Sequence, residues 1–279
     1  MTNNYYVNCQ WLAENLNLPK VVIVDCRFQL ASPTWGYDQY CLAHIPGAYY
    51  LDLDRDLSSP INLHGGRHPL PNLDQLASKL ASFGIVQSET VVVAYDYSRF
   101  AFASRLWWLL RYLGHDRVVL LDGGWHAWEN GNYQTTQDIP QPRKGSFTPQ
   151  SQADWIVDLE TVKNRKDLPG VVLVDSRDSD RYAGKREPID PIAGHIPGAV
   201  NSPWKLVSEP AGYLRPRKEQ AELWSSYQQA AEIIVYCGSG VTACVNLLSL
   251  DLAGINNAKL YPGGWSDWCS YLGRNDDMS

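Results

Sequence analysis

One cysteine lies where a short apolar segment gives way to a glycine-rich loop. The segment 233–236 (IIVY) is typical of a buried β-strand, and 242–253 has the pattern of a helix. Cys237 opens the loop between them, which reads CGSGV. Two glycines let the backbone curl so that N–H groups point inward, and the helix start adds unpaired N–H groups and a positive dipole end. Such a loop favours a thiolate and can hold a persulfide or another anion.

A reactive cysteine in an anion-binding loop fits sulfur transfer, hydrolysis of phosphate esters and reduction of arsenate. A cysteine phosphatase closes its loop with an arginine six residues after the cysteine, where this chain has Ala243. Phosphoryl chemistry therefore lacks its charge clamp. Cys237 could instead be a buried structural cysteine on a tight turn. In that case the two glycines and the serine would have no role in packing.

The overall composition limits the other functions. The five further cysteines form no Cys-x-x-Cys pair, so they predict small buried residues and neither a disulfide framework nor a zinc site. A formal charge of −6 over 279 residues argues against a nucleic-acid partner. No apolar run approaches the roughly 20 residues of a membrane helix. The first residues do not resemble a secretory signal, so we expect a cytoplasmic protein that does not bind membranes.

Four sequence motifs occur twice, in the same order. The pairs are VVIVDCR and VVLVDSR at 21–27 and 171–177, AHIPGA and GHIPGA at 43–48 and 194–199, ETVVVAYD and AEIIVYC at 89–96 and 231–237, and DGGWHAW and PGGWSDW at 122–128 and 262–268. Ordered repetition of this kind indicates a duplicated domain.

Each copy predicts an α/β domain. Short β-branched segments alternate with helical patterns such as LDQLASKLASFG at 73–84, which is typical of a parallel sheet flanked by helices. We therefore predict a first domain over 1–137, a Pro-rich linker over 138–150 and a second domain over 151–279.

The two copies differ at the position that carries the chemistry. Asp96 in the first copy stands where the second copy has Cys237. A carboxylate cannot attack sulfur and would repel an anion. We therefore predict that the first copy is catalytically silent and serves as one wall of a cleft.

These features together resemble the two-domain rhodanese family of sulfurtransferases over nearly the whole chain. The resemblance rests on the paired HIPGA and GGW motifs, on the Asp96/Cys237 difference and on the loop CGSGVTA, which is similar to that of 3-mercaptopyruvate sulfurtransferases. It implies two tandem rhodanese-like domains and transfer of the sulfane sulfur of a small anionic donor to Cys237 as a persulfide. A thiol such as thioredoxin or glutathione, or cyanide, then accepts the sulfur, with no metal or organic cofactor.

The resemblance also implies roles for other residues. Ser239 would help to protonate the leaving enolate, together with Asp54 and a histidine of the segment HGGRHPLP. That histidine is His64 or His68, and we favour His68 because Pro-Leu-Pro follows it. The substrate would also contact the rest of the loop, which consists of Gly238, Gly240, Val241 and Thr242.

Two arginines before the second HIPGA motif hold the substrate carboxylate in the family. Arg181 matches the first, Ile189 occupies the place of the second, and we expect the nearby Arg186 to compensate. Thiosulfate-using members have basic residues after the cysteine, whereas Gly238 and Ser239 are neutral.

We therefore expect 3-mercaptopyruvate as the donor. Two alternatives stay open: a thiosulfate sulfurtransferase, and a relay module that takes persulfide sulfur from a protein partner. A redox-sensing or phosphatase-like protein is the least favoured alternative, because the closing arginine is absent.

Overall fold

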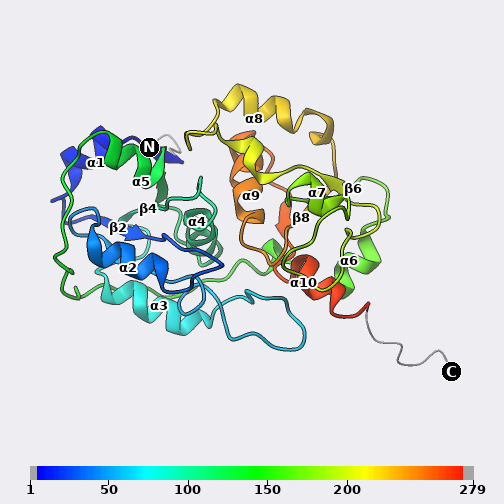
Figure 1. Cartoon of the computed structure of the whole chain (residues 1–279), viewed down its shortest axis with the longest axis horizontal. Helices are drawn as coiled ribbons and strands as arrows, with labels where there is room; N and C mark the ends of the chain where they lie inside the picture. The colour runs from blue at the N-terminus through cyan, green and yellow to red at the C-terminus, as the bar shows by residue number, and fades with distance from the viewer. Residues whose placement is uncertain (1–4, 273–279) are drawn as a thin grey trace. The chain divides into compact units, whose positions relative to one another are not determined.

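The computed structural model of the chain describes residues 5–272, so the ends of the predicted domains at 1–4 and 273–279 lie outside the described residues (Figure 1). The described chain forms two compact units. Unit 1 contains the residues up to Ser59, Leu70–Gln152 and Ser208–Arg215. Unit 2 contains Pro60–Pro69, Ala153–Val207 and the residues from Pro216 onward.

The sheet of unit 1 has five parallel strands in the order β1-β5-β4-β2-β3. In chain order these strands are β1 (Tyr6–Val7), β2 (Val21–Asp25), β3 (Tyr49–Tyr50), β4 (Val91–Tyr95) and β5 (Val118–Leu121). The β-branched strands β2 and β4 are almost entirely buried, as expected for a parallel sheet with helices on its faces. The helices are α1 (Cys9–Asn15), α2 (Trp35–Leu42), α3 (Leu73–Ser82), α4 (Ala103–Tyr112) and α5 (Gly124–Asn130).

Unit 2 repeats this plan with a four-stranded parallel sheet in the order β7-β6-β8-β9. Its strands are β6 (Val171–Asp175), β7 (Val200–Asn201), β8 (Glu232–Tyr236) and β9 (Ala258–Leu260). Its α-helices are α6 (Leu159–Arg165), α7 (Ser179–Tyr182), α8 (Arg217–Leu223), α9 (Ala243–Leu252) and α10 (Gly264–Cys269). Three short 3-10 helices complete it, at Ala153–Trp155, Trp204–Val207 and Ser225–Tyr227. The predicted α/β fold with two parallel sheets is confirmed.

The repeated VD-x-R motif forms the same buried ion pair in both units. Arg27 donates to Asp25 at 2.6 Å, and Arg177 donates to Asp175 at 2.6 Å. In each unit the guanidinium also donates to a carbonyl at the start of the HIPGA motif, namely that of Ala43 or Gly194. The motif therefore fastens the HIPGA segment to the end of a central strand in both units, which gives it the same structural role in each.

Two short segments are exchanged between the halves of the sequence: one from the first half belongs to unit 2, and one from the second half belongs to unit 1. Pro60–Pro69, which the sequence-based boundaries assign to the first domain, belongs to unit 2. There the amide of Gly65 donates to the carboxylate of Asp267 at 2.7 Å. The segment Ser208–Arg215 belongs in turn to unit 1. As a result, the histidines of HGGRHPLP are part of the unit that carries Cys237.

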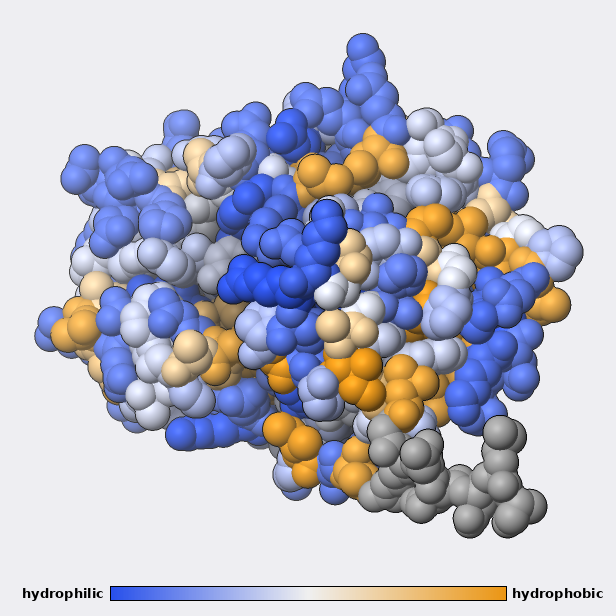
Figure 2. All heavy atoms as spheres, turned by 45° about the vertical axis from the view of Figure 1, so that its right-hand side comes forward, coloured by the Kyte–Doolittle hydropathy of each residue, from blue (hydrophilic) through white to orange (hydrophobic). Residues whose placement is uncertain are grey.

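The surface carries both hydrophilic and hydrophobic residues. Figure 2 shows one face, on which hydrophilic side chains predominate and hydrophobic ones form separate groups. Between residues 5 and 272, no helix has both the length and the apolar character required to cross a lipid bilayer.

Candidate active site

Cys237 lies at the carboxyl end of β8, between that strand and α9 (Figure 1). Ligands of parallel α/β sheets bind at this edge. The thiol residue is buried, with 2% of its surface exposed. Its carbonyl accepts the amide of Trp265 at 2.8 Å, and the carbonyl of Gly238 accepts the amide of Ser266 at 2.8 Å. The first residues of α10, which follow the glycines of the GGW motif, thus hydrogen-bond the backbone of the loop.

The backbone of the loop is fixed by its second glycine and by the first turn of α9. Gly240 has a φ of 73°, and a Cβ there would lie 2.4 Å from the carbonyl oxygen of Pro262. No other residue fits both conditions. The carbonyls of Val241 and Thr242 accept the amides of the residues three positions later, each at 3.1 Å, and so begin the helix.

The corresponding loop of unit 1 holds a negative group of its own. Four backbone amides donate to the buried carboxylate of Asp96, at 2.7, 3.1, 2.8 and 2.9 Å; they belong to Ser98, Phe100, Phe102 and Ala103. The carbonyl of Asp96 accepts the amide of Trp125 at 2.8 Å, as the carbonyl of Cys237 accepts that of Trp265. A loop at this place in the fold therefore gathers amides around one anion, and in unit 1 the protein supplies that anion itself.

Ser239 and His68 form a buried polar pair beside Cys237. The Ser239 hydroxyl and His68 Nδ1 are hydrogen-bonded at 2.7 Å, and both residues are more than nine-tenths buried. The other candidate, His64, instead bonds the Ser270 hydroxyl at 2.7 Å and stacks on Tyr271. The structure thus places His68 against the loop serine, two residues after the cysteine.

Asp54, the third predicted member of this relay, is an exposed residue of unit 1. Its amide donates to the carboxylate of Asp52 at 2.9 Å. Its role in the relay stays a prediction.

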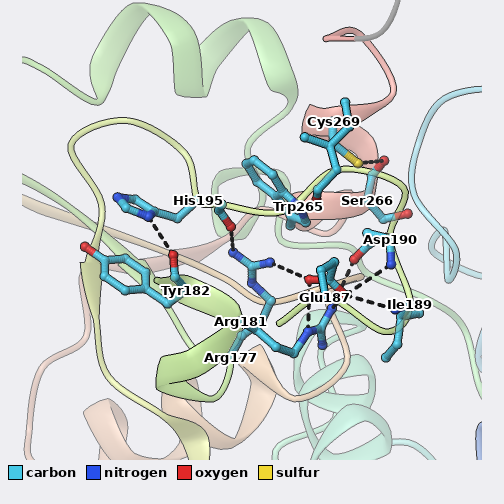
Figure 3. Close-up of polar contacts among 12 residues, drawn as sticks. Arg177, Arg181, Tyr182, Glu187, Ile189, Asp190, His195, Trp265, Ser266 and Cys269 are labelled. Atoms are coloured by element: carbon cyan, nitrogen blue, oxygen red, sulfur yellow. Dashed lines mark hydrogen bonds and ion pairs between the residues drawn. The ribbon is translucent and has the colours of Figure 1, made fainter. Parts of the chain in front are cut away.

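Arg181 extends from α7 into a group of carboxylates that Figure 3 shows in close-up. It donates to both oxygens of Glu187, at 3.1 and 2.7 Å, and to Asp190 at 3.1 Å. Arg186 is exposed, and its backbone amide bonds the carbonyl of Asp180. The substrate-binding roles of both arginines stay predictions.

Arg67 is a residue that sequence reasoning missed. Its guanidinium forms an ion pair with Asp190. A Cβ built on Gly238 would lie 2.8 Å from an Arg67 nitrogen and 3.6 Å from an Arg181 nitrogen. Burial and the positive charge of Arg181 lower the pKa of Arg67, whereas Cys237 and Glu187 oppose this effect. The available signal was its position directly before His68 in HGGRHPLP.

The described residues offer no metal site. Among residues 5–272, no group of three or more His, Cys, Asp or Glu side chains is arranged to hold an ion.

Comparison with known proteins gives matches over most of the chain. Residues 8–131 and 158–271 each match the rhodanese-like domain family. The chain is 41% identical over 273 residues to a probable 3-mercaptopyruvate sulfurtransferase of Pseudomonas aeruginosa, covering 96% of both chains. It is 36% identical over 255 residues to a putative thiosulfate sulfurtransferase of Mycobacterium tuberculosis, covering 90% of this chain and 88% of the relative.

The solved structures show the same likeness. The 3-mercaptopyruvate sulfurtransferase from Leishmania major superimposes with a TM-score of 0.83 at 28% identity, covering 99% of this chain and 76% of the other.

Proposed function

Because the chain belongs to the rhodanese-like family, we propose that it is a 3-mercaptopyruvate sulfurtransferase that works through a persulfide on Cys237. In the first step, the Cys237 thiolate attacks the sulfur of the donor and an S–S bond forms. The donor's C–S bond breaks, and its electron pair leaves on carbon as the enolate of pyruvate. Protonation of that carbon gives pyruvate, and Cys237 keeps the sulfur as a persulfide.

The observation that carries this proposal is the hydrogen bond between Ser239 and His68 at 2.7 Å. An enolate is a strongly basic leaving group and requires a proton donor close to the nucleophile. Sulfite, which leaves when thiosulfate is the donor, is a stable anion without that requirement. A buried hydroxyl–imidazole pair two residues after Cys237 therefore favours a donor whose leaving group is carbon.

The charges around the loop also support a singly charged donor. Three arginines pair here with three carboxylates, so this group is neutral as a whole. Its members are Arg67, Arg177, Arg181, Asp175, Glu187 and Asp190. A monoanion such as 3-mercaptopyruvate fits a neutral group better than the thiosulfate dianion does. Thiosulfate is the second candidate donor, on the strength of the Mycobacterium tuberculosis relative.

The amides of the loop would stabilise the persulfide once it has formed. The Asp96 carboxylate, held by four amides in unit 1, is the internal precedent for an anion at this place. In the second step an acceptor thiolate, or cyanide, attacks the outer sulfur and the Cys237 thiolate leaves. We propose a small thiol or a thioredoxin-like protein as the acceptor.

A cytoplasmic location forms part of the proposal. It is supported by the six cysteines, none of which forms a disulfide within the described residues. Six cysteines without a disulfide are typical of a reducing compartment.

The proposal is tested by mixing the protein with 3-mercaptopyruvate and measuring two products. We expect release of pyruvate and a gain of one sulfur atom in the intact mass, localised by peptide mapping to Cys237. Cys237→Ser should abolish both, whereas Cys41→Ser, which removes a half-buried thiol of unit 1, should change neither. Pyruvate release by Cys237→Ser at the wild-type rate contradicts the proposal, and a higher kcat/KM for thiosulfate identifies the second candidate.

A further inference from the structure

Two guanidinium groups converge on the residue that follows the nucleophile. Arg67 comes from the segment Pro60–Pro69 and Arg181 from α7, and both belong to unit 2. Their nitrogens lie 2.8 and 3.6 Å from the point where a Cβ of Gly238 would be. Only a residue without a side chain leaves this space to the two arginines. We call Arg67 and Arg181 the arginine clamp.

One carboxylate already bridges the arginine clamp. Asp190 accepts from Arg67 with Oδ1 and from Arg181 with Oδ2, the latter at 3.1 Å. Its side chain is only 2% exposed. The backbone amide of Asp190 donates to Glu187 at 3.1 Å, so the loop that carries this carboxylate is itself tied down (Figure 3).

A bridging carboxylate is the same chemical group that a 2-oxo acid donor presents. Two guanidinium groups side by side repel each other and require an anion between them, and a carboxylate meets them with one oxygen each. The remaining charges of this corner are paired: Glu187 accepts from Arg177 at 3.2 Å and from Arg181 at 2.7 Å. Asp190 is therefore the anion for which a donor carboxylate would substitute.

We propose that the arginine clamp binds the carboxylate of the sulfur donor and that Asp190 occupies the clamp until the donor displaces it. Arg67, directly before His68, is thereby the second carboxylate-binding arginine. It takes the role that we expected of Arg186, in place of the residue that Ile189 replaces. Asp190 sets the specificity, because its charge opposes any anion that approaches the clamp. This inference deepens the proposed function and rests on it for the identity of the donor.

The clamp can be tested without any sulfur donor by alkylating Cys237. Iodoacetate and iodoacetamide react by the same step: the thiolate forms an S–C bond and iodide leaves. The two reagents differ only in that iodoacetate carries a carboxylate. The rate constants at Cys237 are followed by mass spectrometry of the modified peptide. Their ratio measures how well the site accepts a carboxylate, because the reactivity of the thiol affects both reagents equally.

We expect Asp190→Asn to raise the iodoacetate-to-iodoacetamide ratio about tenfold and Arg67→Gln to lower it about tenfold. This is the effect of one unit charge about 6 Å away at an effective dielectric constant of about 40. Arg67→Lys, which keeps the charge but not the fork of donors, should fall between wild type and Arg67→Gln.

The matched controls are Arg165→Gln and Glu232→Gln. Arg165 and Glu232 form an ion pair at 2.9 Å at the opposite end of β8. The two substitutions remove one positive and one negative charge, as Arg67→Gln and Asp190→Asn do. At about 3.3 Å per residue the ion pair is about 16 Å from Cys237, beyond the screening length at physiological salt. We expect these variants to keep the wild-type ratio within about twofold. The rate with iodoacetamide alone reports whether each variant has kept its loop intact.

Three results overturn the inference. The first is an unchanged ratio in Arg67→Gln, and the second is a loss with Arg186→Gln in its place. The third is a lower ratio in Asp190→Asn, which would mean that Asp190 holds the arginines in position and does not compete with the ligand. With 3-mercaptopyruvate we expect Asp190→Asn to lower KM and Arg67→Gln to raise it. If the wild-type protein transfers no sulfur but the variants show the expected alkylation ratios, the proposed function is refuted and the arginine clamp is still supported.

Discussion

Removal of the Asp96 carboxylate is expected to destabilise unit 1. The carboxylate accepts hydrogen bonds from four backbone amides of the loop that leads into α4. Asp96→Ala removes the common acceptor of these amides. The loop would then have four donors pointing at an empty, buried position.

The cost follows from the number of bonds and from the burial of the charge. A typical hydrogen bond contributes about 1 kcal/mol net and one to a charged group about 1.5–3 kcal/mol, so the four amides contribute at least about 4 kcal/mol. Burial raises the pKa of Asp96 although the amides act in the opposite direction, so the buried charge itself carries a cost that the substitution releases. We therefore expect Asp96→Ala to lower the free energy of unfolding of unit 1 by about 2–3 kcal/mol.

The measurement is urea denaturation followed by the tryptophan fluorescence of the protein, with Asp116→Ala as the matched control. Asp116 has a side chain that is 81% exposed and meets Arg111 at 3.7 Å, so its removal should change stability by less than about 0.5 kcal/mol. If Asp96→Ala is no less stable than Asp116→Ala, the loop of unit 1 does not depend on its carboxylate. Anion binding by the corresponding loop of unit 2 would then lose its support as well.

Two further predictions follow from the site and from a buried histidine. Ser239→Ala should lower kcat with 3-mercaptopyruvate about 100-fold or more, because it removes the hydroxyl bonded to His68, and should affect thiosulfate far less; equal losses with both donors contradict the role in protonation. Burial lowers the pKa of His115, whose Nδ1 accepts the amide of Ser88 at 3.2 Å. The unfolded chain therefore takes up this proton first, and stability should fall as pH drops below about 6.5, by up to about 1.4 kcal/mol per pH unit. His115→Asn, which can keep an acceptor for Ser88, should show a shallower loss in denaturation at pH 7 and pH 5, and an identical pH dependence refutes this.

The secondary structure around Cys237 was predictable because its causes are local. The predicted strand 233–236 corresponds to β8 (Glu232–Tyr236), and the predicted helix 242–253 corresponds to α9 (Ala243–Leu252). An apolar β-branched run and a glycine at a left-handed position act on their own neighbours. Comparison of the two repeats also singled out Asp96 and Cys237, since the same position carries different chemistry in each.

The partners of the loop could not be predicted in the same way. Arg67 meets Asp190 across 123 residues, and His68 meets Ser239 across 171. The resemblance to a family suggested His68, but nothing in the sequence showed that the arginine before it would pair with Asp190. The prediction that Asp96 would repel anions considered only its charge, and it did not foresee that four loop amides surround that carboxylate.

The sequence by itself determined the duplication and the α/β fold, and it predicted the reactive half and the nucleophile, because each of these depends on residue types and short spacings. Only the tertiary structure decided which side chains lie around the loop that begins at Cys237. The segment Pro60–Pro69 joins unit 2 through contacts with residues about 200 positions later, such as the bond from Gly65 to Asp267. Pairing of that kind depends on the burial and charge balance of the folded chain, and neither has a signature in the local sequence.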